Sequence, residues 1–266
     1  MKIALCVSGQ MRTFDNPGII SLNKKLVNKL SCDVFISTWS NRGVSLWSQV
    51  GRPDMIDLQN AFLVDSITEE KIMKSFDNVR AIEIENYDDF NNKIGNIDIK
   101  DLLNNDFNSR YNNKISSYPE LYKIYKANRL KQAYEDSGNF KYDVVIRTRP
   151  DIAHINTDID VHFDDLANSV YHMNTDSTFF PLPRIYSIFF FGNSKTMDVI
   201  SDSYNAFFEL VAMDSCHHLP AFDSPRLLYN QCIKNGICIK TIHRTVGDVF
   251  RIEEDFNEYV LRFKYT

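Results

Sequence analysis

The chain has 266 residues, of which 44% are hydrophobic and 24% charged, and its formal net charge is −5. This length suits one large domain with a sizeable core, and the acidic balance argues against a nucleic-acid binder. No apolar run approaches the roughly 20 residues of a membrane-spanning helix. Five cysteines without a Cys-x-x-Cys spacing favour a reducing, cytoplasmic environment.

The start of the chain predicts a strand, a helix and a second strand. Residues 2–7 and 32–39 form short apolar runs, and residues 17–30 between them carry an apolar stripe. Asn16 is the expected N-cap, with Pro17 at the first helical position. A right-handed unit of this kind places both strand exits at one edge of a parallel sheet.

Further strands and helices follow from the same kinds of pattern. The other expected strands are residues 61–64, 80–84, 144–146, 169–173, 188–192 and 237–242. The other expected helices are residues 68–76, 117–138, 195–211 and 223–235. Residues 1–266 therefore read as a single α/β domain, with a variable helical or loop insertion around residues 87–116.

The helix over residues 117–138 has the clearest signals at its ends. Ser117 to Glu120 has the pattern of a capping box, and Gly138 is the expected C-cap. Most of its polar residues Lys123, Lys126, Asn128 and Arg129 are expected on a solvated face, as charged and polar helix residues usually are.

The most informative stretch is Phe140 to Ile152. Val144 to Ile146 reads as a strand that is buried on both faces, and Pro150 requires the strand to end or to lie at an edge. Arg147, Arg149 and Asp151 follow at its carboxyl end, where open α/β sheets bind their ligands. Two guanidinium groups and a carboxylate suit a phosphorylated substrate. The alternative interpretation is a surface salt-bridge cluster.

Other expected strand exits add polar groups that could serve the same ligand. The candidate residues at these exits are Ser8, Gly9, Gln10, Arg12, Thr38, Trp39 and Gly192. Backbone N–H groups and an arginine after the first strand can meet phosphate, although this turn is neither a P-loop nor a dinucleotide fingerprint. The combined set suits a nucleotide with a diphosphate and a sugar.

Several segments resemble one family when they are taken in order. They read ALCVSGQMRTF, CDVFISTW, LYKIYKANRLKQAYE, YDVVIRTRPDI, FFFGNSKTMDVIS and DSPRLLYNQCIKNGI. This series resembles bacterial glycosyltransferases or glycosyltransferase-like proteins of the GT-A type, encoded with genes for capsule, O-antigen or lipopolysaccharide. The resemblance implies a GT-A-like (Rossmann-like), mainly parallel central sheet flanked by helices. It also implies transfer of a sugar from a nucleotide-sugar donor to a saccharide or lipid-linked acceptor.

The resemblance also implies roles for individual residues. GT-A enzymes hold a divalent ion with an Asp-x-Asp motif, and the matching place here reads Arg149-Pro150-Asp151. Asp151 is therefore the expected ligand for Mn²⁺ or Mg²⁺, unless Arg147 and Arg149 neutralise the diphosphate directly. Ser8 to Arg12 would lie near the nucleotide.

The acceptor side is implied in the same way. Gly192 and the helix that starts at Asp223 would lie near the acceptor. Asp223 is the predicted catalytic base, with Asp176 as the second candidate. For either residue taken alone, the alternative is an ordinary helix cap or turn residue.

Two other functions fit the same residues. One is a nucleotidyl- or phosphotransferase, which would depend strictly on Mg²⁺. The other is a non-catalytic relative that binds a nucleotide sugar or a glycan. A lipid-linked acceptor would bring a cytoplasmic enzyme to the inner face of the plasma membrane. Tyr259 to Tyr265 would then make a peripheral contact, unless this tail is an ordinary strand.

Overall fold

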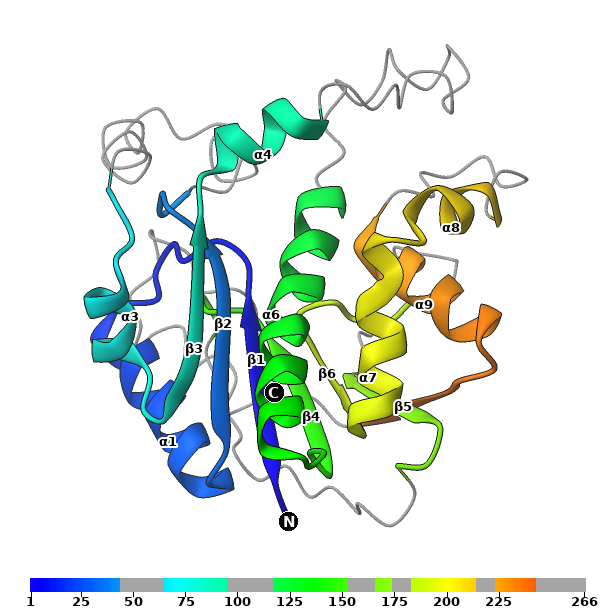
Figure 1. The fold of residues 1–266 in the computed structure, drawn as a ribbon, viewed down its shortest axis with the longest axis horizontal. Coiled ribbons are helices and arrows are strands. Elements are labelled where there is room, and N and C mark those ends of the chain that lie inside the picture. The colour runs from blue at the N-terminus through cyan, green and yellow to red at the C-terminus, as the bar shows by residue number, and fades with distance from the viewer. Residues whose placement is uncertain (44–64, 95–116, 153–165, 174–182, 214–222, 243–266) are drawn as a thin grey trace, which may run out of the picture.

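The computed structural model describes residues 1–43, 65–94, 117–152, 166–173, 183–213 and 223–242 (Figure 1). Their strands form one seven-stranded sheet in the order β3-β2-β1-β4-β6-β5-β7. The strands are β1 (Ile3–Ser8), β2 (Asp33–Trp39), β3 (Val79–Glu85), β4 (Val144–Thr148), β5 (Ser169–Met173), β6 (Phe189–Gly192) and β7 (Cys238–Ile242). All neighbouring pairs are parallel except the two that involve β6.

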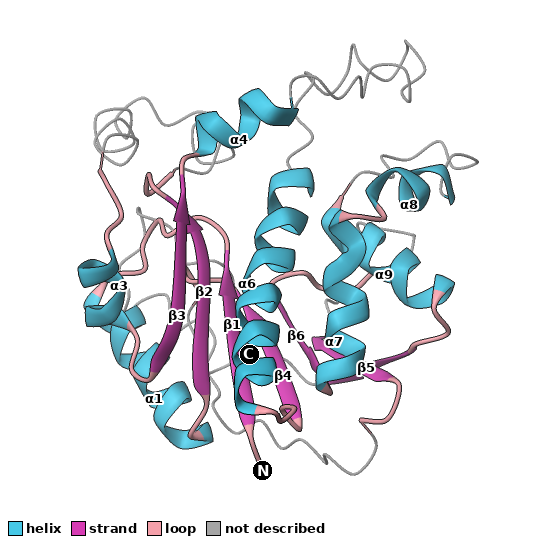
Figure 2. Ribbon diagram, in the orientation of Figure 1, coloured by secondary structure: helices cyan, strands magenta, loops and turns pink. Residues whose placement is uncertain are grey.

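Helices cover both faces of this sheet (Figure 2). They are α1 (Pro17–Leu30), α3 (Glu69–Ser75), α4 (Tyr87–Ile94), α6 (Ser117–Gly138), α7 (Ser194–Ser201), α8 (Phe207–Met213) and α9 (Ser224–Lys234), with a short 3-10 helix over Asp202–Tyr204. The predicted fold class, a mainly parallel α/β sheet flanked by helices, is confirmed. The expected strand over residues 61–64 lies outside the described residues.

Local capping signals explain where three helices begin. The Asn16 side chain accepts a hydrogen bond from the Gly18 N–H at the start of α1. Thr68 accepts from Lys71 N–H before α3, and Asp223 accepts from Arg226 N–H before α9. Each cap satisfies an N–H group that has no partner inside its helix.

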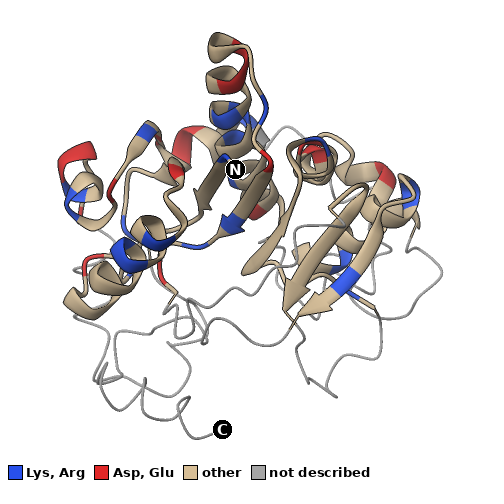
Figure 3. Ribbon diagram, turned by 90° about the horizontal axis from the view of Figure 1, so that it is seen from below, with Lys and Arg blue, Asp and Glu red and all other residues tan. Residues whose placement is uncertain are grey.

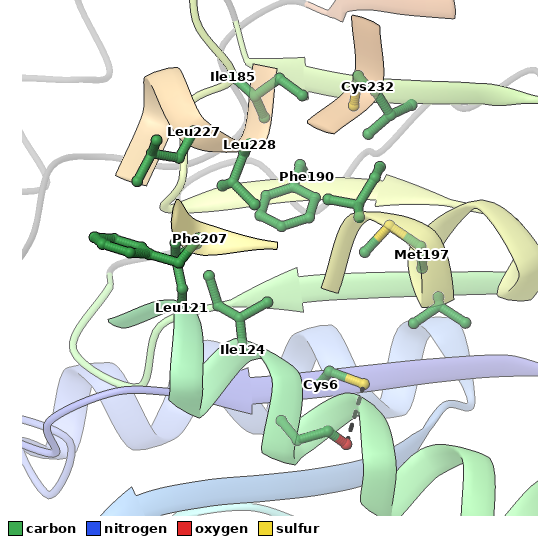
Figure 4. Packing of buried hydrophobic residues seen from close by; sticks show 14 of the residues in the cluster. Cys6, Leu121, Ile124, Ile185, Phe190, Met197, Phe207, Leu227, Leu228 and Cys232 are labelled. Carbon is green, nitrogen blue, oxygen red and sulfur yellow. Dashed lines mark hydrogen bonds between the residues drawn. The ribbon is translucent and has the colours of Figure 1, made fainter. Parts of the chain in front are cut away.

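The sheet separates two hydrophobic cores. One core packs the sheet against α6, α7, α8 and α9, and Figure 4 shows Phe190 of β6 among side chains from these helices. The other packs the opposite face against α1 and α3. Alternate residues of β4 face the two cores, since Val145 belongs to the first, and Val144 and Ile146 to the second. Such two-sided burial explains why β4 is an almost continuous apolar run.

Helix α6 departs from its predicted pattern. Of the four polar residues expected mostly in solvent, Lys123 and Asn128 are buried, Lys126 is half-buried and Arg129 is exposed. The Lys123 ammonium donates to Glu85 at 2.6 Å and lies 4.0 Å from the centre of the Trp39 ring, so it is buried with both a counter-charge and a π-face. The left-handed residue at the end of the helix is Asn139, with φ 51°, in place of the predicted Gly138.

The predicted helix over residues 195–211 is broken. The structure has α7, a 3-10 turn and α8 in its place, and the cap is Asn193. The Asn205 side chain donates to the Asp202 carboxylate at 2.6 Å within the break. The apolar pattern predicts one continuous helix because the buried residues of α7 and α8 face the same core.

Acidic and basic residues are interspersed on the described elements (Figure 3). None of the helices in the described part of the chain combines the length and the apolar composition that crossing a membrane requires. The parallel strands β1 to β4 all end at one edge of the sheet, which we call the carboxyl edge. Helices α4 and α6 begin at this edge (Figure 1).

Candidate functional site

The turn after β1 supplies the first part of the candidate site. Gly9 has φ +123°, a conformation that L side chains rarely adopt, and its N–H donates to Ser37 O at 3.2 Å. Arg12, with φ 37°, turns back so that its Nε and Nη2 donate to Gln10 Oε1 at 3.2 and 2.9 Å. The turn thus brings an arginine to the carboxyl edge.

The exit of β4 supplies the second part. Arg149 donates to both oxygens of Asp151, from Nε at 2.9 Å and from Nη2 at 2.8 Å. Arg12 Nη1 donates to the same carboxylate at 3.1 Å, so Asp151 joins the exits of β1 and β4. The Asp151 side chain is 0% exposed, whereas those of Arg149 and Arg12 are 19% and 20% exposed.

The charges at this cluster explain the protonation state of Asp151. Burial by itself would raise the pKa of its carboxyl group. The positive charges of Arg149 and Arg12 outweigh this effect, and the pKa is lowered below its ordinary value. Asp151 is therefore an ionised anchor for two arginines at neutral pH. The arrangement is a salt-bridge cluster, as in the alternative interpretation, but its carboxylate is buried and its two arginines are only about a fifth exposed.

Arg147 of β4 forms the third part and is almost fully buried. Its Nε donates to Ser8 Oγ at 3.1 Å, and its Nη2 lies 3.5 Å from Ser8 O and 3.6 Å from Glu120 Oε1. Burial lowers the pKa of Arg147 to about 10, which still leaves the guanidinium charged at neutral pH. Its Nη1 is buried and has no hydrogen-bond partner in the part of the chain that the structure describes.

Glu120 was missed as a site residue by the sequence analysis. The capping box predicted for it is not formed, because Glu120 Oε2 accepts from Ser224 Oγ at 2.7 Å and Ser117 Oγ has no hydrogen-bond partner. Glu120 Oε1 is also buried without a hydrogen bond. Glu120 thus connects β4 through Arg147 to the first residue of α9. The sequence signals at Glu120 were the capping-box spacing and its position just before the buried run of α6, and neither points to a ligand site.

Asp223, the predicted base, lies beside this network. Its Oδ1 caps α9 by accepting from Arg226 N–H at 2.9 Å, and its Oδ2 pairs with Arg184 Nη1 at 2.6 Å. Burial raises the pKa of Asp223, and the Arg184 charge only partly opposes the rise. The capping role foreseen as its alternative is therefore present, and the raised pKa suits proton transfer as well.

Two other predicted site residues are held inside the protein. Thr38 donates to Gly9 O at 2.8 Å and is buried, so it braces the turn after β1. Trp39 is 4% exposed and packs against Tyr87 and Tyr122. The second candidate base, Asp176, lies outside the described residues.

Gly192 is not brought together with the other predicted residues. Because β6 is antiparallel to β4, Gly192 pairs with Val145, while Phe189 pairs with Thr148. The expectation that the exit of β6 shares the carboxyl edge is therefore wrong. A Cβ atom on Gly192 would lie 2.9 Å from Ser169 O, so close packing against β5 accounts for this glycine.

The described residues around Asp151 do not fit a divalent ion. Both Asp151 oxygens already accept guanidinium N–H groups, and two positive charges stand within 3.1 Å. The described residues contain no group of three or more His, Cys, Asp or Glu side chains that could hold a metal. A hard cation of this kind prefers several oxygen ligands, and the groups that reach Asp151 here are nitrogen donors.

A pocket of about 800 Å³ lies at the opposite edge of the sheet. Its lining includes Met1, Lys141, Asn193 and Lys195. It contains none of the residues predicted for the site. The buried, unpartnered groups at the carboxyl edge make that edge the better candidate site.

Comparisons with known proteins give little beyond this geometry. No family model matches the chain, and no curated protein matches it. Among solved structures, it is similar to a nucleoside-diphosphate-sugar pyrophosphorylase from Vibrio cholerae RC9, with a TM-score of 0.41 and 9% sequence identity. That match covers 97% of this chain and 99% of the other.

Proposed function

We propose that the protein is a glycosyltransferase that moves a sugar from a nucleotide-sugar donor to a saccharide or lipid-linked acceptor. The observation that carries this proposal is the buried, unpartnered Nη1 of Arg147, set beside Arg12 and Arg149 at the carboxyl ends of β1 and β4. A buried donor without a partner costs free energy, which a bound anion recovers. Phosphate oxygens match arginine in both charge and geometry.

The local balance of charge supports an anionic ligand. Three guanidinium groups, those of Arg12, Arg147 and Arg149, meet the carboxylates of Asp151 and Glu120. One positive charge remains for a ligand. A diphosphate that departs from a sugar carries the growing negative charge of the reaction, and fixed donors in a water-poor site stabilise it strongly.

The reaction would proceed as a substitution at the anomeric carbon. The acceptor oxygen forms a bond to this carbon, and the bond from the carbon to the diphosphate oxygen breaks with its electron pair left on the diphosphate. A base then takes the acceptor proton. Asp223 is our candidate for this base because it lies next to Ser224, which contacts the arginine network, and its pKa is raised.

The cellular location and the biosynthetic role of the protein are part of the same proposal. We place the reaction in the cytoplasm, at the inner face of the plasma membrane when the acceptor is lipid-linked, in the synthesis of capsule, O-antigen or lipopolysaccharide. The cysteines Cys6, Cys32, Cys232 and Cys238 are free thiols, as a reducing compartment requires. Residues 1–266 would act as one domain, and the insertion over residues 87–116 begins with α4 at the carboxyl edge.

A binding screen followed by product analysis tests this function. The purified protein is melted with UDP-, GDP-, CMP- and dTDP-sugars, and saturating binding of one class raises the melting temperature. The shift should disappear in Arg149→Ala and persist in Arg129→Ala, a matched control on the exposed face of α6. The donor that binds is then incubated with saccharide and lipid-linked acceptors.

The products distinguish the remaining functions. Release of nucleoside diphosphate, or of nucleoside monophosphate from a CMP-sugar, supports glycosyl transfer. Release of inorganic pyrophosphate from a nucleoside triphosphate and a sugar phosphate would identify a nucleotidyltransferase. Binding without turnover against the whole acceptor panel would favour a non-catalytic binding protein, and no binding to any nucleotide sugar would refute the proposal.

A further inference from the structure

The hydrogen bonds that Asp151 accepts from Arg12 and Arg149 limit how the site can bind a diphosphate. A divalent ion between Asp151 and a diphosphate would need free carboxylate oxygens on its protein side. Both oxygens of Asp151 are committed to Arg149 and Arg12 at 2.8 to 3.1 Å. An ion that displaced these guanidinium groups would leave them without their counter-charge in a site where Asp151 is 0% exposed.

Each arginine is fixed along one side and keeps donors on another. Arg149 gives Asp151 its Nε and one Nη2 proton, and its Nη1 group donates to no other residue among those described. Arg147 is fixed by Ser8 through Nε, and its buried Nη1 has no partner. Arg12 is held by Gln10 and Asp151 together. The protein therefore orients three fixed cations before any ligand arrives.

We infer that this site binds the pyrophosphate group of its donor through Arg12, Arg147 and Arg149, without a divalent ion. Asp151 is a positioning residue that holds Arg12 and Arg149 in place. This inference rests on the proposed function, and it narrows the donors to nucleoside diphosphate sugars. It also separates the protein from nucleotidyltransferases, in which metal ions neutralise the phosphates that react.

Binding of nucleoside diphosphates with and without metal tests the inference. Titration calorimetry is run with UDP, GDP, CDP and dTDP, first in excess EDTA and then with Mn²⁺ or Mg²⁺. CMP is included as a monophosphate. We expect one diphosphate to bind in EDTA with a dissociation constant within about twofold of its value with metal. We expect Arg149→Ala to weaken binding by about tenfold to a hundredfold, the loss typical of a charge-assisted hydrogen bond.

The positioning role of Asp151 needs a separate readout. Asp151→Asn keeps the shape and size of the side chain but loses its negative charge. It should weaken diphosphate binding in EDTA under conditions where circular dichroism shows the variant to be folded. Arg129→Ala, on the exposed face of α6, should bind as the natural protein does.

The outcomes separate this inference from the proposed function. Binding of a diphosphate only when metal is present would overturn the inference and leave the glycosyltransferase proposal standing, as would binding of CMP alone. Undiminished diphosphate binding by folded Asp151→Asn would overturn the positioning role. Absence of binding to any nucleotide, with or without metal, would overturn both the inference and the proposed function.

Discussion

Replacing Asp151 by alanine removes the single carboxylate that holds two arginines. The substitution deletes three charge-assisted hydrogen bonds, of 2.8, 2.9 and 3.1 Å, from a side chain that is 0% exposed. Removing one partner of a buried ion pair typically destabilises a protein by about 3–5 kcal/mol, because the remaining charge stays buried. Arg12 and Arg149 each keep about a fifth of their side-chain surface in water. We therefore expect the lower end, about 3 kcal/mol.

Urea unfolding followed by circular dichroism measures this loss in the free energy of unfolding. For a chain of this size, about 3 kcal/mol corresponds to a fall in melting temperature of about 6–12 °C. The matched control is Lys74→Ala, which breaks the exposed pair between Lys74 and Glu70 and should leave the midpoint unchanged. A loss below about 1 kcal/mol for Asp151→Ala would refute the reasoning, because that is the value of a solvated surface pair.

Two further predictions concern Asp151 and Arg149, and a third concerns Gly192 of β6. The pKa of Asp151 is lowered in the folded protein, so the stability from its ion pairs is complete above about pH 4 and is lost as pH falls through the folded pKa. Between pH 6 and pH 3, the free energy of unfolding measured in urea should fall less in Asp151→Asn than in the natural protein. Equal falls in the two proteins would contradict this prediction. Arg149→Asp creates an Asp-x-Asp sequence, so diphosphate binding should vanish in EDTA and return with Mn²⁺. Unchanged affinity in EDTA would show that Arg149 does not contact the ligand. Gly192→Ala places a Cβ atom 2.9 Å from Ser169 O and should destabilise the sheet by about 1–3 kcal/mol without changing nucleotide affinity, as calorimetry can show. Weaker nucleotide binding at unchanged stability would show instead that Gly192 contributes to the binding site.

Much of the fold could be predicted because its signals are local. The apolar run Val144 to Ile146 identifies a strand buried on both faces without reference to its neighbours. The caps Asn16 and Asp223 are specified by residues within three positions of them. The same local logic placed Arg149 and Asp151 at a strand exit, where the structure has them.

The remaining features depend on partners that lie far away in the sequence. The direction of β6 is not encoded in the apolar pattern of Phe189 to Gly192, because a buried strand reads alike in either direction. Glu120 has the spacing of a capping box, yet it bonds to Ser224, 104 positions away. Lys123 is polar in sequence but is buried because an acid and an aromatic ring from the sheet receive it. Tertiary contacts decided each of these cases.

The reversed direction of β6 has a consequence for altering what the protein recognises. In a parallel strand, the loop that follows the strand faces the ligand, so protein engineers vary that loop. Here the chain enters β6 at the carboxyl edge of β1 to β4, where we propose that the ligand binds, and Ile185 N–H in this entry segment donates to Pro225 O of α9 at 3.0 Å. A library meant to test the proposed acceptor side should therefore vary the residues before Phe189, because Asn193, directly after Gly192, caps α7 at the other edge of the sheet.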